Sequence, residues 1–326
     1  MKKFAIWMCT LLSASLLLTA CGGKVQEVDN SAQKNTNAST QTSVSDVESA
    51  KTITYLDKTY KLAKTDHIII ASLEAMEDAA VLGVKPTGAV TSGGKFPEFM
   101  EKAMEGAADV GDRMQPSAET ILKLKADVIL GSSKFRPAVA EQLGKVAPLV
   151  PVSHISTNWE ANLLMLGQLT GKEAKAKEIL DKYKQDAEAA QQKLKPIWGN
   201  KKVLMVRIRT GNLYAYPADV YFNPSLYADL GAKVPEELNT VKAQEAVSLE
   251  KLADMNPDYL FVQFSEGENK DQPQALADLE KNPIWSSINA VKNGKTFVNI
   301  VDPNAQGGTS WSKLAFLEAV MNRLSQ

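Results

Sequence analysis

The sequence predicts an α/β fold with two lobes, each containing a parallel-type sheet, joined by one long helix. Strand-like and helix-like patterns alternate through most of the chain, which is typical of parallel sheets covered by helices. One helix-to-strand unit also occurs twice, and a long helical pattern lies between its two copies. Residues 52–326 form a stretch that is long for one hydrophobic core, which favours two lobes.

Residues 1–20 have the pattern of a bacterial lipoprotein signal peptide. MKK supplies positive charge, FAIWMCTLLSASLLL is apolar, and LTAC ends at Cys21 as a lipobox does. A transmembrane helix is the alternative, but the apolar run is shorter than the ~20 residues that a span needs. We therefore expect cleavage before Cys21 and lipidation of that residue. Because Cys9 leaves with the signal, neither a disulfide nor a cysteine metal site is expected.

Residues 21–51 are rich in Ser, Thr, Asn and Gln and have few large apolar side chains. Such a segment cannot bury a core, so we interpret it as a disordered tether behind the lipidated cysteine. The formal net charge of the whole chain is −1, so no basic excess points to a nucleic-acid partner.

The repeated unit comprises SAETILKLKADVIL, residues 117–130, and SLEKLADMNPDYLF, residues 248–261. Each copy predicts a serine N-cap, an acidic first turn, a short amphipathic helix and then an apolar strand. We expect one copy in an N-terminal lobe, residues 52–157, and the other in a C-terminal lobe, residues 200–326.

Further elements are predicted around the repeats. Strands are predicted at HIIIAS (67–72), TGAV (87–90), LVPVSH (149–154), KKVLMVRIR (201–209) and KTFVNIV (295–301), and helices at EAMEDAAVLG (74–83) and QALADLEKN (274–282). Between the lobes lies a helical segment, residues 158–199. Its part from Lys172 to Lys195 lacks Pro and Gly, so a helix there would extend about 36 Å, enough to bridge two lobes.

Two arginines occupy one face of the strand in LMVRIRTGNLYAY, residues 204–216. With a period of two, Arg207 and Arg209 point together while Val206 and Ile208 point the other way. The strand then enters the TGN turn, and ligands of open α/β sheets bind at the carboxyl ends of strands. The arginines therefore either face a ligand cleft or lie on an edge strand with solvated or ion-paired side chains.

Other polar residues share this topological position. Lys134 follows the strand of the first repeat, Arg113 lies in the loop before that repeat, and Lys242 and Gln244 precede the second repeat. Any single lysine of this kind is more often a solvated surface charge. Equivalent loops of two lobes carrying cations together indicate an anionic ligand.

Two residues are weaker candidates for the same cleft. Lys95 in GKFPEF follows a predicted strand, and Gln263 in VQFS ends one with a polar group. Lys95 is also compatible with a place on the rim.

A metal centre and an enzyme active site are both disfavoured. A site for a bare metal ion needs several converging ligands, whereas the chain has two histidines, His67 and His154. Ser153 is adjacent to His154, but no GxSxG elbow, P-loop or dinucleotide fingerprint occurs. We expect no catalysis and no cofactor; a cell-surface hydrolase is the remote alternative.

From about residue 52 to the end, this architecture resembles the class III substrate-binding proteins of ABC importers. The segments VESAKTITYLDKTY, GKFPEF, VRIRTGNLY, VQFS, KNPIW and DPNAQGGTSWSK are similar to those of the lipoproteins that bind ferric bacillibactin, a catecholate siderophore. The resemblance implies the class III periplasmic-binding-protein fold, with two Rossmann-like lobes and one rigid linking helix. It also implies capture of a ferric siderophore and delivery to an ABC iron importer.

The resemblance implies roles for individual residues. Six residues stand at positions that match ligand contacts and would hold an Fe³⁺ tris-catecholate trianion: Arg113, Lys134, Arg207, Arg209, Lys242 and Gln244. The siderophore, not the protein, would hold the iron. Arg113 stands where the relatives have lysine, which keeps the charge and adds a planar fork, and Thr210 stands where they have glutamine.

Glu119 and Glu250 open the helices of the two repeats, where acids also complement the helix macrodipole. By resemblance they would dock to arginines of a permease dimer. The resemblance and the lipobox together imply a monomer anchored through Cys21 on the extracytoplasmic face of a Gram-positive type of cell membrane. The ligand would be a catecholate siderophore of the bacillibactin or enterobactin type. Another anionic iron chelate, a hydroxamate siderophore or haem is the alternative ligand.

Overall fold

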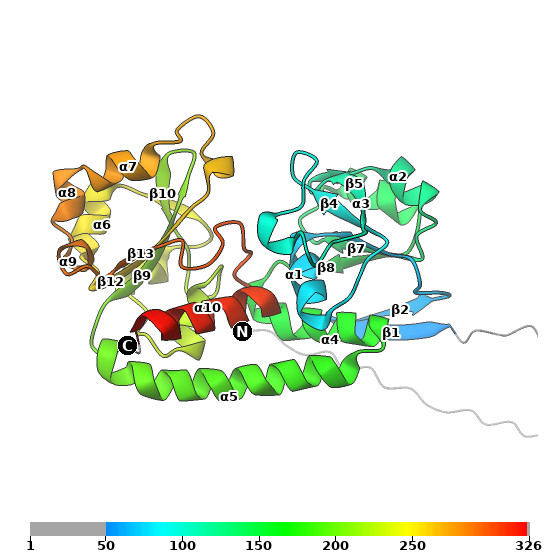
Figure 1. Ribbon diagram of the computed structural model, residues 1–326, viewed down its shortest axis with the longest axis horizontal. Helices are drawn as coiled ribbons and strands as arrows, with labels where there is room; N and C mark the ends of the chain where they lie inside the picture. The colour runs from blue at the N-terminus through cyan, green and yellow to red at the C-terminus, as the bar shows by residue number, and fades with distance from the viewer. Residues whose placement is uncertain (1–49, 325–326) are drawn as a thin grey trace, which may run out of the picture. The chain divides into compact units, whose positions relative to one another are not determined.

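The computed structural model describes residues 50–324 (Figure 1). The predicted signal peptide, the lipobox with Cys21 and nearly all of the tether lie outside this range. Within it, no helix combines the length and the apolar character needed to cross a membrane.

A β-hairpin begins the described chain. It consists of β1 (Lys51–Tyr55) and β2 (Lys58–Leu62), which pair antiparallel. The Tyr55 hydroxyl donates to Asn162 Oδ1 at 2.5 Å and accepts from the Ser153 N–H at 2.7 Å. Because Tyr55 is buried, these bonds tie the hairpin to the N-terminal lobe.

The N-terminal lobe contains a six-stranded sheet. Its strands are β3 (Ile68–Ala71), β4 (Gly88–Thr91), β5 (Ala108–Asp112), β6 (Gln115–Pro116), β7 (Val128–Ser132) and β8 (Leu149–Val152). Their order is β6-β5-β4-β3-β7-β8, and every pairing except β5 with β6 is parallel. The helices of this lobe are α1 (Leu73–Leu82), α2 (Ala118–Lys123) and α3 (Pro137–Gly144), with the 3-10 turns η1 (Glu98–Met100) and η2 (Ser156–Asn158).

The predicted linking helix is confirmed and runs from one lobe to the other (Figure 1). The chain passes through α4 (Trp159–Thr170) into α5 (Glu173–Trp198). The residues of α5 that are buried recur every three or four positions, as expected for one apolar stripe: Ala176, Leu180, Tyr183, Ala187, Ala190, Leu194 and Trp198. The helix continues through Pro196 in its last turn, past the stretch without Pro and Gly that ends at Lys195 but within the predicted segment 158–199.

The C-terminal lobe contains a five-stranded sheet. Its strands are β9 (Val203–Arg209), β10 (Asn212–Ala215), β11 (Glu245–Val247), β12 (Tyr259–Phe264) and β13 (Thr296–Val298), in the order β11-β10-β9-β12-β13. Around the sheet lie α6 (Leu249–Met255), α7 (Ala275–Glu280), α8 (Pro283–Ser286), α9 (Asn289–Lys292) and α10 (Ser310–Leu324). Shorter helical turns are η3 (Ser225–Asp229), η4 (Glu236–Thr240) and η5 (Glu266–Glu268).

This second sheet is of the predicted parallel type at its centre, but it also contains an antiparallel strand that the sequence did not predict. β9, β12 and β13 are parallel, whereas β10 pairs antiparallel with both of its neighbours, β9 and β11. The cause is the turn between β9 and β10, in which Thr210 and Gly211 have φ of 46° and 75°. Two successive residues with positive φ match a tight hairpin turn, which sends the chain straight back beside β9.

The internal repeat is confirmed in structural detail. The side chains of Ser117 and Ser248 each accept a hydrogen bond from the N–H three residues later, as helix N-caps. Asp127 Oδ2 accepts from the N–H just before β3 at 2.8 Å, and Asp258 Oδ2 accepts from the N–H just before β9 at 2.9 Å. In both lobes the shared serine therefore caps the helix of the unit, and the shared aspartate fastens the unit to a neighbouring strand.

The two lobes also meet where α1 packs against the start of α10. Glu77 and Asp78 of α1 are buried there, and oxygens of their carboxyl groups accept hydrogen bonds from the loop before α10 and from its first turn. The donors are the N–H of Gln306, the hydroxyls of Thr309 and Ser312, and both the N–H and the hydroxyl of Ser310. Burial raises the pKa of Glu77 to about 8 and that of Asp78 to about 7.

Candidate functional site

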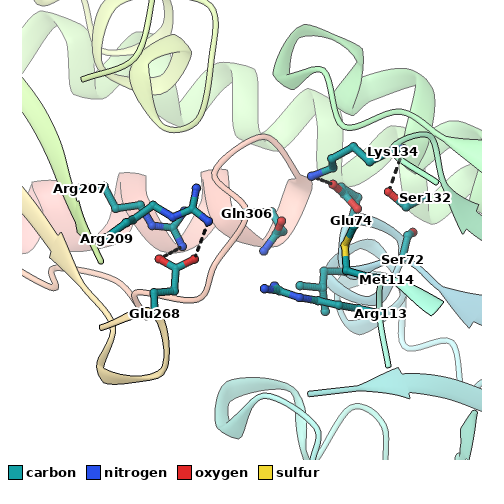
Figure 2. A pocket seen from close by; sticks show the side chains of 11 residues that line it. Ser72, Glu74, Arg113, Met114, Ser132, Lys134, Arg207, Arg209, Glu268 and Gln306 are labelled. Atoms are coloured by element: carbon teal, nitrogen blue, oxygen red, sulfur yellow. Dashed lines mark hydrogen bonds and ion pairs between the residues drawn. The ribbon is translucent and has the colours of Figure 1, made fainter. Parts of the chain in front are cut away.

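A cleft between the lobes contains two adjoining cavities, with volumes of about 290 and 320 Å³. They share four lining residues, Leu73 and Arg113 from the N-terminal lobe and Arg207 and Glu268 from the C-terminal lobe. Figure 2 shows the charged groups of the first cavity projecting from both sides. The carboxyl ends of β9 and β12 lead into this cleft, as expected for an α/β sheet.

The N-terminal side of the first cavity presents two cations and one acid. Arg113 lies in the turn between β5 and β6, and Lys134 lies just after β7. Lys134 Nζ is 3.0 Å from Glu74 Oε1. Glu74 stands in the first turn of α1 behind the N-cap Ser72, and its side chain is only 5% exposed.

The C-terminal side presents Arg207 and Arg209, which point the same way from β9 as their spacing predicts (Figure 2). One carboxylate serves both, because Glu268 Oε2 is 2.9 Å from Arg207 Nη2 and Glu268 Oε1 is 3.4 Å from Arg209 Nη2. Arg207 is 12% exposed, and its guanidinium lies 5.0 Å from the centroid of the Tyr221 ring. The sequence left two alternatives for these arginines, and the structure combines them: they face the cleft and are ion-paired.

Two phenols lie behind the arginines. Burial raises the pKa of both Tyr216 and Tyr221, so both are neutral around neutral pH. The Tyr216 hydroxyl donates to Gln244 Oε1 at 2.9 Å, and Arg209 Nη1 donates to the same oxygen at 2.6 Å. Gln244 thus holds Arg209 in place.

The remaining candidate residues occupy different places. Lys95 lines the second cavity together with Lys270. Lys242 is exposed before β11, and Gln263 is buried on β12 next to Arg207, with neither amide atom hydrogen-bonded in the described structure. Lys242, Gln244 and Gln263 are absent from the linings of both cavities in residues 50–324.

Sequence reasoning missed Glu74, Glu268 and Gln306, which also line the first cavity. Glu74 had a partial signal, since it is one of three acids in a short helix that is otherwise apolar. Glu268 lies in the polar loop after β12, where acids are common, so nothing in the sequence distinguished it. Gln306 is positioned by its N–H, which donates to the buried Glu77 at 2.8 Å.

The charge of the cleft is positive. Four cations and two carboxylates line the first cavity, giving +2, and Lys95 and Lys270 raise the total for both cavities to +4. In a recess partly removed from water, such charges favour a multiply charged anion.

The predicted rivals gain no support from the geometry. Ser153 Oγ accepts from the Ile155 N–H and from Asn158, and His154 Nδ1 lies 2.8 Å from Ser133 Oγ, so the adjacent serine and histidine are engaged elsewhere. Burial and nearby Lys134 lower the pKa of His154. Among residues 50–324, no group of three or more His, Cys, Asp or Glu side chains is placed to hold a metal ion.

The two glutamates of the repeats lie away from the cavities. Glu119 stands in the first turn of α2, is 78% exposed and forms an ion pair with Lys123 at 2.7 Å. Glu250 occupies the equivalent exposed position in the first turn of α6. Both are accessible to a partner.

The chain belongs to the periplasmic binding protein family, whose model matches residues 68–299. It is therefore a binding protein rather than an enzyme, with the class III fold that the resemblance implied.

Among its relatives is the iron-uptake system-binding protein of Bacillus subtilis (strain 168), which is 48% identical over the full length of both chains. A crystal structure of the triscatecholate siderophore binding protein FeuA from B. subtilis, complexed with ferri-bacillibactin, has a TM-score of 0.80 and 50% identity, covering 85% of this chain and 98% of that one. Staphylococcus aureus SirA complexed with staphyloferrin B gives a TM-score of 0.72 at 26% identity, covering 84% and 98%. The resemblance inferred from the sequence is confirmed.

Proposed function

We propose that the protein captures a ferric catecholate siderophore of the bacillibactin or enterobactin type and delivers it to an ABC iron importer. The observation that carries the proposal is the convergence of Arg113 and Lys134 from one lobe with Arg207 and Arg209 from the other on a single cleft. A ferric tris-catecholate is a trianion, and the cleft has the opposite charge. The 50% sequence identity to a protein crystallised with ferri-bacillibactin supports the same ligand class.

Charge complementarity explains how such a ligand would be selected. An ion contact at 4 Å has an energy of about 4 kcal/mol at an effective dielectric constant near 20, before desolvation is subtracted. Several such contacts from fixed positions favour a trianion over a neutral chelate, although each net gain is smaller. Lys95 adds a further cation at the edge of the cleft. Gln244 would act behind the arginines, because it holds Arg209 in place. Lys242 and Gln263 line neither cavity and would act from positions close to the ligand or to the arginines.

Delivery requires attachment and docking. Lipidation of Cys21 would hold the protein on the extracytoplasmic face of the cell membrane, with residues 22–51 as the tether. Glu119 and Glu250, exposed at equivalent positions of the two lobes, would contact the two halves of a permease dimer. One monomer would serve one importer.

A panel titration tests the proposal. The full-length chain in detergent is titrated with ferric bacillibactin, ferric enterobactin, a ferric hydroxamate and haem, and quenching of tryptophan fluorescence is followed. Tight binding of the catecholates alone is expected. Binding of only the hydroxamate or haem would keep the transport class and overturn the ligand, and binding of none would overturn the proposal.

A further inference from the structure

Two carboxylates stand inside a cleft that otherwise suits an anion. Glu268 contacts both arginines of β9 and is 16% exposed, and Glu74 contacts Lys134 from the opposite lobe. Three of the four cations of the first cavity are therefore paired with carboxylates of the protein itself (Figure 2). A carboxylate repels the anion that the cleft is proposed to bind, so its presence calls for an explanation.

The position of Glu268 is fixed by the backbone around it. Its carbonyl oxygen accepts from the Thr210 N–H at 3.1 Å, in the turn that follows the arginines. The next residue, Asn269, is buried; it accepts from the Gly211 N–H at 3.0 Å and donates to the Ile208 carbonyl at 3.0 Å. The helical turn η5 is thereby fastened to the hairpin that bears Arg207 and Arg209. The carboxylate is held beside its partners, which gives it a high effective concentration.

The contact leaves hydrogen-bonding capacity unused. Arg207 Nε is buried and has no hydrogen-bond partner in the described structure, and Glu268 Oε2 approaches Arg207 without a well-directed hydrogen bond. The pair thus balances charge without saturating the guanidinium. A stronger multidentate acceptor can improve on it, whereas a small singly or doubly charged ion gains little by replacing a carboxylate that is already in place.

From this geometry we infer that Glu268 is a specificity-determining residue: a built-in counter-anion that keeps small inorganic anions such as phosphate out of the cleft. The inference rests on the proposed function and deepens it. A trianion that also reaches Arg113, Lys134 and Lys95 offsets the loss of the Glu268 contact through its other contacts. Phosphate has only four oxygens on one phosphorus atom with which to contact cations, so it has fewer contacts to offer as compensation.

The experiment compares phosphate binding by the full-length wild type, Glu268→Gln and Glu266→Gln, using calorimetry and the phosphate dependence of the melting temperature. Glu266 is the matched control, because it is exposed in the same turn η5 and its replacement changes the net charge equally. We expect Glu268→Gln to bind inorganic phosphate at least about tenfold more tightly than the wild type and to be stabilised by it. Glu266→Gln should match the wild type.

Two results would overturn the inference. Unchanged phosphate affinity in Glu268→Gln shows that the carboxylate excludes nothing, and an equal gain in Glu266→Gln shows a general effect of net charge. If Glu268→Gln is too unstable to titrate, Glu268→Asp retains the charge with a shorter reach, and intermediate phosphate affinity is expected. Wild-type affinity in Glu268→Asp, with no gain in stability from phosphate in Glu268→Gln, again overturns the inference.

A second arm uses ferric bacillibactin with the same proteins. The variant Glu268→Gln should bind it at least as well as the wild type, so that the preference for catecholate over phosphate falls about tenfold. Loss of affinity for both anions would show that Glu268 only positions the arginines. Failure of the wild type to bind the catecholate overturns the proposed function, while the phosphate comparison still judges the role of Glu268.

Discussion

Replacing Arg207 by Gln should weaken binding of ferric bacillibactin by about two orders of magnitude. The guanidinium is 12% exposed, lies 2.9 Å from Glu268 and donates to the Pro303 carbonyl at 3.3 Å, so it is held firmly at the wall of the cleft. Truncating one partner of a buried charge pair costs about 2–5 kcal/mol of binding free energy. A loss of about 3 kcal/mol corresponds to roughly a hundredfold change in Kd.

The assay is a fluorescence titration of the wild type, Arg207→Gln and Arg323→Gln at one ionic strength, with melting temperatures as the check of folding. Arg323 is the matched control because it is exposed in the last turn of α10, away from both cavities. Arg323→Gln should leave the Kd unchanged. A change of less than about threefold in folded Arg207→Gln, or an equal loss in the control, would refute the electrostatic account of the cleft.

Three further outcomes are expected. Between the pKa of 4.5 of a free glutamate and the folded value of about 8 for Glu77, the folded state keeps a proton that the unfolded state loses. The free energy of unfolding should therefore fall as pH rises from about 5 to about 8, by up to about 1.4 kcal/mol per pH unit for this group. Glu77→Gln should flatten the pH profile of the melting temperature. An equally steep profile in the variant would contradict the assignment of this effect to Glu77. Combining Glu119→Ala with Glu250→Ala should abolish iron uptake by cells while the Kd for the siderophore stays the same, and a weakened Kd would refute separate docking and binding roles. Gly211→Ala, at φ 75°, should lower the free energy of unfolding by about 1 kcal/mol in denaturant titrations, whereas an unchanged midpoint would show that the turn tolerates a side chain.

Much of the fold could be predicted because local rules determine it. Ser117 and Ser248 predict helix N-termini because their side chains accept hydrogen bonds from the first turn, and the apolar stripe of α5 follows a helical period. The antiparallel strand β10 was missed because Thr210 takes a positive φ that is unusual for a residue other than glycine.

Of the residues that line the cleft, the sequence could place the arginines of β9 but not the glutamates. Arg207 and Arg209 could be placed because strand periodicity and topology locate them without knowledge of any distant contact. Glu74 and Glu268 could not, since their importance depends on which cation each one meets after folding. The same holds for Glu77, whose partners lie more than 200 positions further along the chain.

One measurement tests most directly the central claim that the cleft selects its ligand by charge. It is the ratio of the dissociation constants for ferric bacillibactin and a neutral ferric trihydroxamate, measured on the same protein at low and high salt. Selection by charge predicts a preference for the catecholate of at least about a hundredfold at low salt. The preference should shrink as salt rises, because the cleft is open enough for its charges to be screened in part. Equal affinities, or a catecholate preference that salt leaves untouched, would contradict the account.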